Sequence, residues 1–367
     1  MKNTMGHNIT MTVFGESHGA AIGCVLDGLP SGFRISRERL KEDMDRRRAV
    51  GAISTGRSEA DQVEFLSGIK DDVTEGTPLA ILIRNTNVRR KDYDEIRWLA
   101  RPGHADYAAE MRYRGFQDAS GGGHFSGRLT APMTAAGSIV RQMLEAKGIL
   151  IGSHISRLYD IEDDPLLAHH IDETLRSLNA KSFAVINEET GKKMIKAIEE
   201  ARKEKDSLGG ILETAVIGME AGIGEPIFGS LESELAAALF GVPAVKGIEF
   251  GAGFGFASMF GHEANDRFTM FHGKVATITN HNGGINGGIT NGMPVIFRTV
   301  IKPTPSIARP QFTVDFRTKE NTSIEIHGRH DPAIIHRARI VIDSVTALVI
   351  ADMLAGAHGT QWLGESE

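Results

Sequence analysis

The 367-residue chain has a single cysteine, Cys24, which lies in the apolar stretch AAIGCVLDG. One cysteine excludes a disulfide within the chain and favours a reducing, cytoplasmic setting. No run approaches 18 uncharged apolar residues, so we expect no membrane span. The N-terminus, MKNTMGHNITMTVF, alternates polar and apolar residues and lacks the apolar core of a signal peptide.

Several familiar chemical motifs are also missing. There is no GxxxxGK[ST] stretch, which excludes a Walker-type phosphate loop, and GAGFGF (251–256) is only loosely similar to a dinucleotide fingerprint. Fourteen histidines invite a metal interpretation, but neither HExxH nor paired Cys/His spacing occurs, so no metal site is predicted. The formal net charge of −6 argues against a nucleic-acid partner.

Glycine and arginine, in contrast, are distributed unusually. The chain has 42 glycines, about one residue in nine against a usual share of roughly 7%. Three of them are consecutive in GGGHFSGRLT (121–130), although ordering glycine costs more backbone entropy than ordering any other residue. Arginines gather in RRR (46–48) and recur beside glycine or histidine at Arg57, Arg101, Arg128 and Arg329. Local positive charge on an acidic chain suits a small anionic ligand.

Hydrophobic periodicity predicts strands and helices that are intermixed without strict alternation, which favours an α+β fold. Strands are expected at 9–14, 20–27, 62–69, 78–85, 149–161, 209–219, 275–280 and 293–301. Helices are expected at 36–48 and 230–240, capped by Ser36 and Ser230, and at 129–147, 191–205 and 331–355, the last with Pro332 in its first turn. We interpret 1–367 as one domain with a peripheral, charged segment at about 162–208.

Two histidine motifs point to proton transfer. GESHG (15–19) joins two predicted strands and places Ser17 and His18 in the turn, although a plain hairpin turn explains this spacing equally well. It does not fit the GxSxG nucleophile elbow. RPGHAD (101–106) sets Arg101 and His104 around a Pro-Gly turn. Two histidines beside glycine and near arginine favour acid–base chemistry around neutral pH over idle turn residues.

Three further motifs are less specific. In GRHDP (328–332), Asp331 is either an N-cap of the last helix or part of a site beside Arg329. KPTPS (302–306) suits a ligand-edge clamp, and NGGINGG (282–288) allows a close backbone approach. The residues alone therefore describe a soluble enzyme with glycine-lined loops, proton-transfer histidines and an arginine-rich anion site.

Seven motifs in this order resemble the chorismate synthase family, from about residue 3 to 355: GESHG, DRRR, EADQVEFLSGI, RPGHADY, the GGG–S–R stretch, KPTPS and GRHDP. The resemblance implies an α+β sandwich, with helices layered between antiparallel sheets, that assembles as a homotetramer. It also implies an anti-1,4-elimination that converts 5-enolpyruvylshikimate-3-phosphate into chorismate and phosphate. Reduced FMN (FMNH2) is required although the reaction has no net redox change.

The resemblance further implies roles for individual residues. His18 would protonate the departing phosphate, His104 would protonate or hydrogen-bond the reduced flavin, and Asp331 would assist removal of the ring proton. The substrate ligands would be Ser17, Arg47, Arg57 and Arg128. Reduced FMN would lie along His124, Ser126, Ala244, Gly287, Lys302, Pro303, Thr304, Pro305, Ser306 and Arg329, and the glycines at 121–123 would let the backbone run beside flavin and substrate.

The chain departs from the family pattern at two places. Most members continue the glycines as GGGRSSAR, whereas here His124 occupies the position of that arginine. In AVGAIST (49–55) no arginine follows RRR before Arg57. If a protonated His124 replaces the missing charge, flavin or substrate affinity should weaken as the pH rises from about 6 to about 8.

Two other functions remain open at this stage. A flavin-dependent oxidoreductase acting on a small anionic substrate would consume NAD(P)H in step with product, and an FMN-binding carrier would have no activity. As the chain shows no additional domain, we expect an external flavin reductase to supply reduced FMN. We expect no nucleic-acid or membrane partner, and Met and Phe residues in 254–271 suit a subunit interface.

Overall fold

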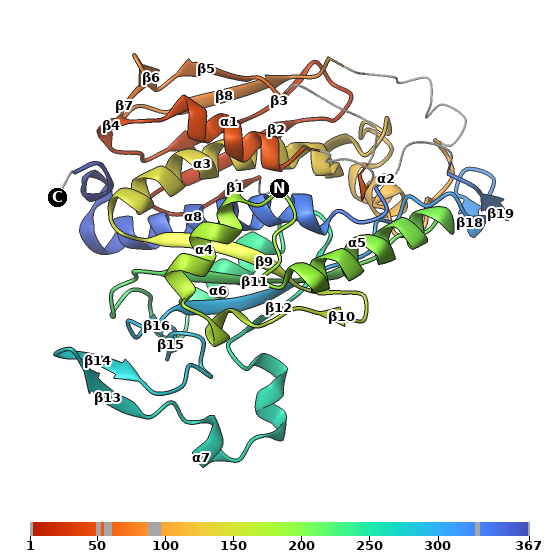
Figure 1. Cartoon of the computed structure of the whole chain (residues 1–367). Coiled ribbons are helices and arrows are strands. Elements are labelled where there is room, and N and C mark those ends of the chain that lie inside the picture. Colours follow the sequence, from red (N-terminus) through yellow and green to blue (C-terminus); the bar gives the residue numbers. More distant parts are fainter. Residues whose placement is uncertain (1–2, 49–52, 55–60, 87–96, 327–330, 366–367) are drawn as a thin grey trace.

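Two five-stranded antiparallel sheets form separate layers with long helices between them (Figure 1). The computed structural model describes residues 3–48, 53–54, 61–86, 97–326 and 331–365. The first sheet has the order β1 (Thr4–Met5), β2 (Thr10–Gly15), β3 (Ala21–Asp27), β8 (Leu79–Arg84) and β5 (Val63–Ser67). The second has the order β10 (Ile161–Glu162), β9 (Leu150–Leu158), β11 (Gly210–Ile217), β17 (Val295–Ile301) and β12 (Val245–Phe250). The predicted α+β class is confirmed.

Two helices, α3 (Thr130–Ala146) and α8 (Ile335–His358), fill the space between the sheets. Helix α3 packs on β3 and β8, α8 packs on β9 and β11, and the two helices pack on each other. Their approach requires Gly137, because a Cβ there would lie 2.3 Å from the Cβ of Ser344. By length and composition α8 could cross a membrane, but 83% of its apolar window is buried. It is the central core helix of the fold.

The second sheet is covered on both faces, and side-chain alternation along its strands shows how. Ile151, Val216 and Phe297 belong to the central core, whereas their neighbours Leu150, Ala215 and Ile296 belong to a separate apolar cluster. Leu175 and Leu178 of α4 (Ile171–Ala180) complete that cluster, so α4 covers the outer face of the sheet. The helix expected at 191–205 is present as α5 (Glu188–Lys203).

Helix starts follow the predicted caps in two cases and not in a third. Ser36 caps α1 (Arg37–Arg46) and Ser230 caps α6 (Leu231–Leu239), each by accepting a backbone N–H. Helix α8 begins at Ile335, four residues later than expected. The N-cap interpretation of Asp331 is therefore wrong, because its carboxylate binds the Arg337 side chain instead.

The remaining elements lie at the edges of these layers. They are β4 (Ser31–Arg34), β6 (Ile69–Lys70), β7 (Val73–Glu75), α2 (Asp106–Tyr113), α7 (Gly261–Ala264), β13 (Phe268–Phe271), β14 (Lys274–Thr277), β15 (Ile285–Asn286), β16 (Ile289–Thr290), β18 (Gln311–Asp315) and β19 (Glu320–Ile324). Short 3-10 helices occur at η3 (Gly123–Phe125), η4 (Gly127–Leu129), η5 (Leu166–Ala168), η6 (Gly253–Ser258) and η7 (Thr360–Gly364). The segment from η6 to β14 projects away from the second sheet in Figure 1 and exposes Phe254, Phe260, Phe268, Met270 and Phe271.

Candidate active site

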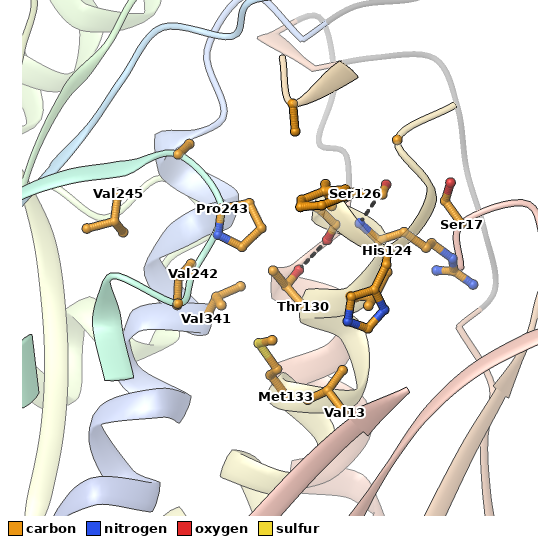
Figure 2. Close-up of a pocket in the computed structure, with 18 of the residues that line it drawn as sticks. Val13, Ser17, His124, Ser126, Thr130, Met133, Val242, Pro243, Val245 and Val341 are labelled. Atoms are coloured by element: carbon orange, nitrogen blue, oxygen red, sulfur yellow. Dashed lines mark hydrogen bonds between the residues drawn. The ribbon is translucent and has the colours of Figure 1, made fainter. Parts of the chain in front are cut away.

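A cavity of about 1210 Å³ opens where loops from both sheets meet the first turn of α3 and one face of α8. Figure 2 shows apolar side chains on two sides of it. Val242, Pro243 and Val245 come from the segment that leads into and begins β12, and Val13 and Met133 come from β2 and α3. Polar lining comes from the GESHG turn, the segment 101–130, the KPTPS turn and Asp331, and also from Arg47, Asp61 and Arg337.

The GESHG turn places its serine and histidine in this lining. Strands β2 and β3 pair antiparallel, so GESHG is a hairpin turn as well as part of the cavity wall. The Ser17 and His18 side chains are buried, and Ser17 Oγ lies 2.9 Å from His18 Nδ1. The Ser17 N–H donates to the Gly123 carbonyl at 3.1 Å, which attaches the turn to the triple-glycine segment. The hydroxyl and that attachment orient the imidazole.

Contacts within the protein explain why glycine is needed at positions 121 and 123. Gly121 has φ +67°, and a Cβ there would lie 2.4 Å from His18 Cε1. At Gly123 (φ +51°) a Cβ would lie 2.3 Å from the Asp118 carbonyl oxygen. The atoms that these Cβ atoms would meet belong to the protein itself. Gly121 and Gly122 also line the cavity, and the expected approach of flavin and substrate to this backbone stays a prediction. Gly121 makes room for the imidazole of His18.

His104 is held between a carbonyl and a hydroxyl. Its Nδ1 lies 3.1 Å from the Pro102 carbonyl oxygen and its Nε2 lies 2.8 Å from Ser306 Oγ. Burial, and then the charge of Arg101, lower the pKa of His104 to about 4. The ring is thus neutral near pH 7. Because a carbonyl only accepts, the proton lies on Nδ1, and the Ser306 hydroxyl donates to Nε2.

Two arginines distant in sequence meet at one carboxylate. Arg47 stands at the C-terminus of α1, and Arg128 belongs to η4. The Asp61 carboxylate accepts from Arg47 Nη2 through one oxygen and from Arg128 Nη1 through the other. Burial raises the pKa of Asp61, but the charges and hydrogen bonds of the two arginines outweigh it, and the net pKa is lowered. The carboxylate is therefore ionised at neutral pH.

Asp331 lines the cavity beside the same group. Arg337 Nη1 donates to Asp331 Oδ2 at 2.5 Å, and Arg337 Nε donates to the Arg47 carbonyl oxygen at 2.8 Å. The Arg337 guanidinium therefore connects the Asp331 carboxylate to the backbone of Arg47, a predicted substrate ligand.

Most of the predicted cofactor residues reach the cavity. His124, Ser126, Ala244, Lys302, Thr304, Pro305 and Ser306 line it. His124 Nδ1 lies 2.8 Å from the Gly15 carbonyl oxygen, so that carbonyl accepts a hydrogen bond from the ring. Ala244 has φ +78°, an uncommon conformation for a residue with a Cβ, and its carbonyl accepts from the Lys302 N–H at 2.9 Å. Lys302 Nζ donates to the Gly103 carbonyl at 2.6 Å.

Four predicted site residues are not placed in the cavity. Among the described residues, Pro303 packs against Gly209, and Gly287 lies in the turn between β15 and β16; neither lines the cavity. Arg57 and Arg329 lie outside the described residues.

Asp61 and Arg337 are site residues that the sequence did not single out. Asp61 lies within the motif EADQVEFLSGI. The feature that could have identified it as a site residue is a carboxylate among motifs that are rich in arginine. Arg337 is a charge within the apolar helix 331–355.

The fold and the cavity together are those of an α+β protein that brings arginines and histidines to one cavity, an arrangement that suits an enzyme acting on a small anion. The sequence profile described as "Chorismate synthase" matches residues 9–355. A chorismate synthase of Pyrococcus abyssi is 44% identical over 349 residues, covering 95% of this chain and 96% of that protein. One of Methanosarcina barkeri is 43% identical over 351 residues, covering 95% of each.

A solved structure described as "Crystal Structure of Chorismate Synthase" superposes with a TM-score of 0.76 at 25% identity, covering 97% of this chain and 94% of that chain. The chain belongs to the chorismate synthase family. Its activity is that of a carbon–oxygen lyase, which converts 5-enolpyruvylshikimate-3-phosphate into chorismate and phosphate.

Proposed function

We propose that the cavity carries out this lyase reaction as an anti-1,4-elimination with reduced FMN (FMNH2) bound beside the substrate. The observation that carries the proposal is that His18, His104, Asp331 and the Arg47–Arg128 pair all line one cavity. Departure of a phosphate and a ring proton requires a proton donor, a proton acceptor and fixed positive charge. All three are present on rigidly held side chains.

The cavity also fits a flavin. Figure 2 draws Val242, Pro243 and Val245 on one side of the cavity and Met133 and Val13 on another, so an aromatic ring bound there would meet apolar side chains from both. The Thr304 Oγ1 atom is buried and has no hydrogen-bond partner among the described residues, so a polar ligand would satisfy it. When bound, reduced FMN supplies electron density to the substrate as the phosphate leaves.

The two histidines have different tasks in this proposal. His18, oriented by Ser17, donates its proton to the departing phosphate oxygen. His104 is neutral in the free protein, and an anion bound beside it would raise its affinity for a proton. It then holds that proton toward reduced FMN, along a cofactor site formed by His124, Ser126, Ala244, Lys302, Thr304, Pro305 and Ser306, with Arg329.

The charged side chains bind the substrate and assist removal of its proton. Arg47 and Arg128, with Ser17 and Arg57, bind the phosphate and carboxylates, since guanidinium groups match such anions in two-point contacts. Asp331 assists removal of the ring proton, and Arg337 keeps its carboxylate at the cavity wall.

We place this enzyme in the cytoplasm as a homotetramer of single-domain chains, supplied with reduced FMN by an external flavin reductase. The single cysteine supports a reducing compartment, and burial raises the pKa of its thiol to about 12, so it is unreactive. The exposed Phe and Met side chains of the η6–β14 segment support an assembly through that segment.

An anaerobic assay tests the proposed reaction. The protein is supplied with the enolpyruvyl substrate and a small amount of photoreduced FMN, and phosphate release and chorismate absorbance are followed. We expect many turnovers per reduced FMN and none with oxidised FMN alone. Consumption of reduced flavin or NAD(P)H in step with product would instead establish an oxidoreductase.

A further inference from the structure

The Asp61 carboxylate lies between two guanidinium groups that the proposed function assigns to substrate binding. All three line the cavity, yet the side chains of Asp61, Arg47 and Arg128 are only 1%, 8% and 9% exposed. Asp61 belongs to a different segment of the chain from either arginine. Its backbone φ is +44°, in the left-handed region. A residue other than glycine keeps that conformation only where its surroundings hold it there.

Charge explains why a carboxylate is needed at this point. Two guanidiniums brought together in a poorly hydrated site repel each other, and burial disfavours each charge. The pKa of Arg47 is lowered by burial and by the charges of Arg337 and Arg128, and the Asp61 carboxylate opposes this effect. With Asp61 ionised, the three groups carry a net charge of about +1, which is still attractive to an anion.

Two further contacts of the pair are longer and go to neutral groups. Arg47 Nη1 donates to Thr130 Oγ1 at 3.4 Å, and Arg128 Nε donates to Asn85 Oδ1 at 3.2 Å. Among the described residues, Arg47 Nε has no hydrogen-bond partner. A carboxylate that contacts both guanidiniums holds two like charges more firmly than a neutral hydroxyl and a neutral amide at these distances.

We infer that Asp61 is a positioning residue, which holds Arg47 and Arg128 at the separation and orientation that the anionic groups of the substrate require. This inference rests on the proposed roles of the two arginines. Asp61 itself does not contact the reacting atoms.

The test is Asp61→Asn, which keeps the shape of the side chain and removes its charge. We expect KM for the enolpyruvyl substrate to rise at least about tenfold, the size expected for a lost charged hydrogen bond, with a smaller change in kcat. Equilibrium binding of the substrate without flavin should weaken by the same factor. Loss of folded protein would lower the apparent kcat and leave KM unchanged.

A matched control is Asp72→Asn, which removes a carboxylate from the exposed Arg37–Asp72 pair. It should leave KM unchanged. In an Arg47→Ala background, Asp61→Asn should raise KM by a smaller factor than in the unaltered protein, because one of the two groups that it positions is already absent. An unchanged or lower KM in Asp61→Asn, or an equal effect in both backgrounds, would overturn the inference. Failure of the unaltered protein to form product would count against the proposed function instead.

Discussion

The run RRR at 46–48 supplies arginines to two buried aspartate groups with different surroundings. Arg46 Nη1 donates to Asp43 at 2.5 Å, and Arg141 Nη1 donates to both oxygens of Asp43 at 3.0 Å. Arg47, one residue further along, meets Asp61. The Asp43 group is closed, since none of its members is among the described residues that line the cavity, whereas the Asp61 group is open to it.

This comparison shows that burial of an arginine does not by itself indicate a ligand site. Both groups pair guanidinium with carboxylate, and both carboxylates have lowered pKa values despite burial. The closed group connects α1 to α3 and belongs to the structure of the core. The open group has the same chemistry beside an empty volume that a substrate can enter. The variants described next separate structural from functional roles.

The largest effect is expected from His18→Ala, a substitution in the lining of the cavity. Removing a group that transfers a proton in the transition state should lower kcat by about 10²- to 10⁴-fold, with little change in melting temperature. Steady-state kinetics and a thermal melt measure the two quantities. A variant that retains full kcat would remove His18 from the mechanism.

Substitutions in the closed Asp43 group should change the stability of the fold. Arg141→Met leaves Asp43 with a weaker set of partners in the core and should destabilise the fold by about 3–5 kcal/mol. Arg128→Met, in the open group, should instead raise KM and cost less stability. Denaturant unfolding and KM measured for both variants give the contrast. Equal changes in both quantities for the two variants would contradict it.

Two histidines should give opposite pH dependences of stability. The pKa of His104 is lowered to about 4, so the unfolded chain binds a proton more readily below about pH 6.5. The free energy of unfolding should thus fall from about pH 6.5 toward about pH 4, by no more than about 3 kcal/mol in total. His104→Asn should flatten this acid-side fall.

The contribution of His154 to the free energy of unfolding should change with pH in the opposite direction. Although burial lowers the pKa of His154, its hydrogen bonds to Asp163 and Glu213, at 3.2 and 3.1 Å, outweigh burial, and the net pKa is raised. Its stabilising contribution is present below the unfolded pKa and is lost as the pH rises through the folded one. His154→Gln should remove this alkaline-side loss, as measured by denaturant unfolding across pH. A parallel response of the His104 and His154 variants would refute the assignment.

The smallest effect is expected from a methyl group beside His18. Gly121→Ala places a Cβ against the imidazole and in the left-handed region, which costs about 1–2 kcal/mol of backbone strain. Displacement of His18 should also lower kcat several-fold. Gly127→Ala is the control, because a Cβ there meets nothing within 4 Å. Similar kinetics for the two variants would show that Gly121 does not position His18.

Local patterns in the sequence determined much of the framework. Alternation at 9–14 and 20–27 predicted β2 and β3, and side-chain caps predicted the starts of α1 and α6, because such signals involve neighbouring residues only. Two elements were missed for different reasons. Helix α4 has Ile171, Leu175 and Leu178 at helical spacing, but it is only 10 residues long and lies in a charged segment. Strand β12 carries a single buried residue, Val245, and shows no strong pattern.

The sequence by itself also determined which residue types the site contains, since the histidines, arginines and Asp331 can be recognised in motifs. Only the tertiary structure decided their partners. Asp61 meets Arg47 and Arg128 across 14 and 67 residues of chain, and Gly121 meets His18 across the loops of the cavity. Contacts between distant segments depend on how the sheets and central helices stack, and no local pattern records that packing. Asp331, a good helix cap by sequence, instead binds Arg337 and lies at the cavity wall, because α8 begins only at Ile335.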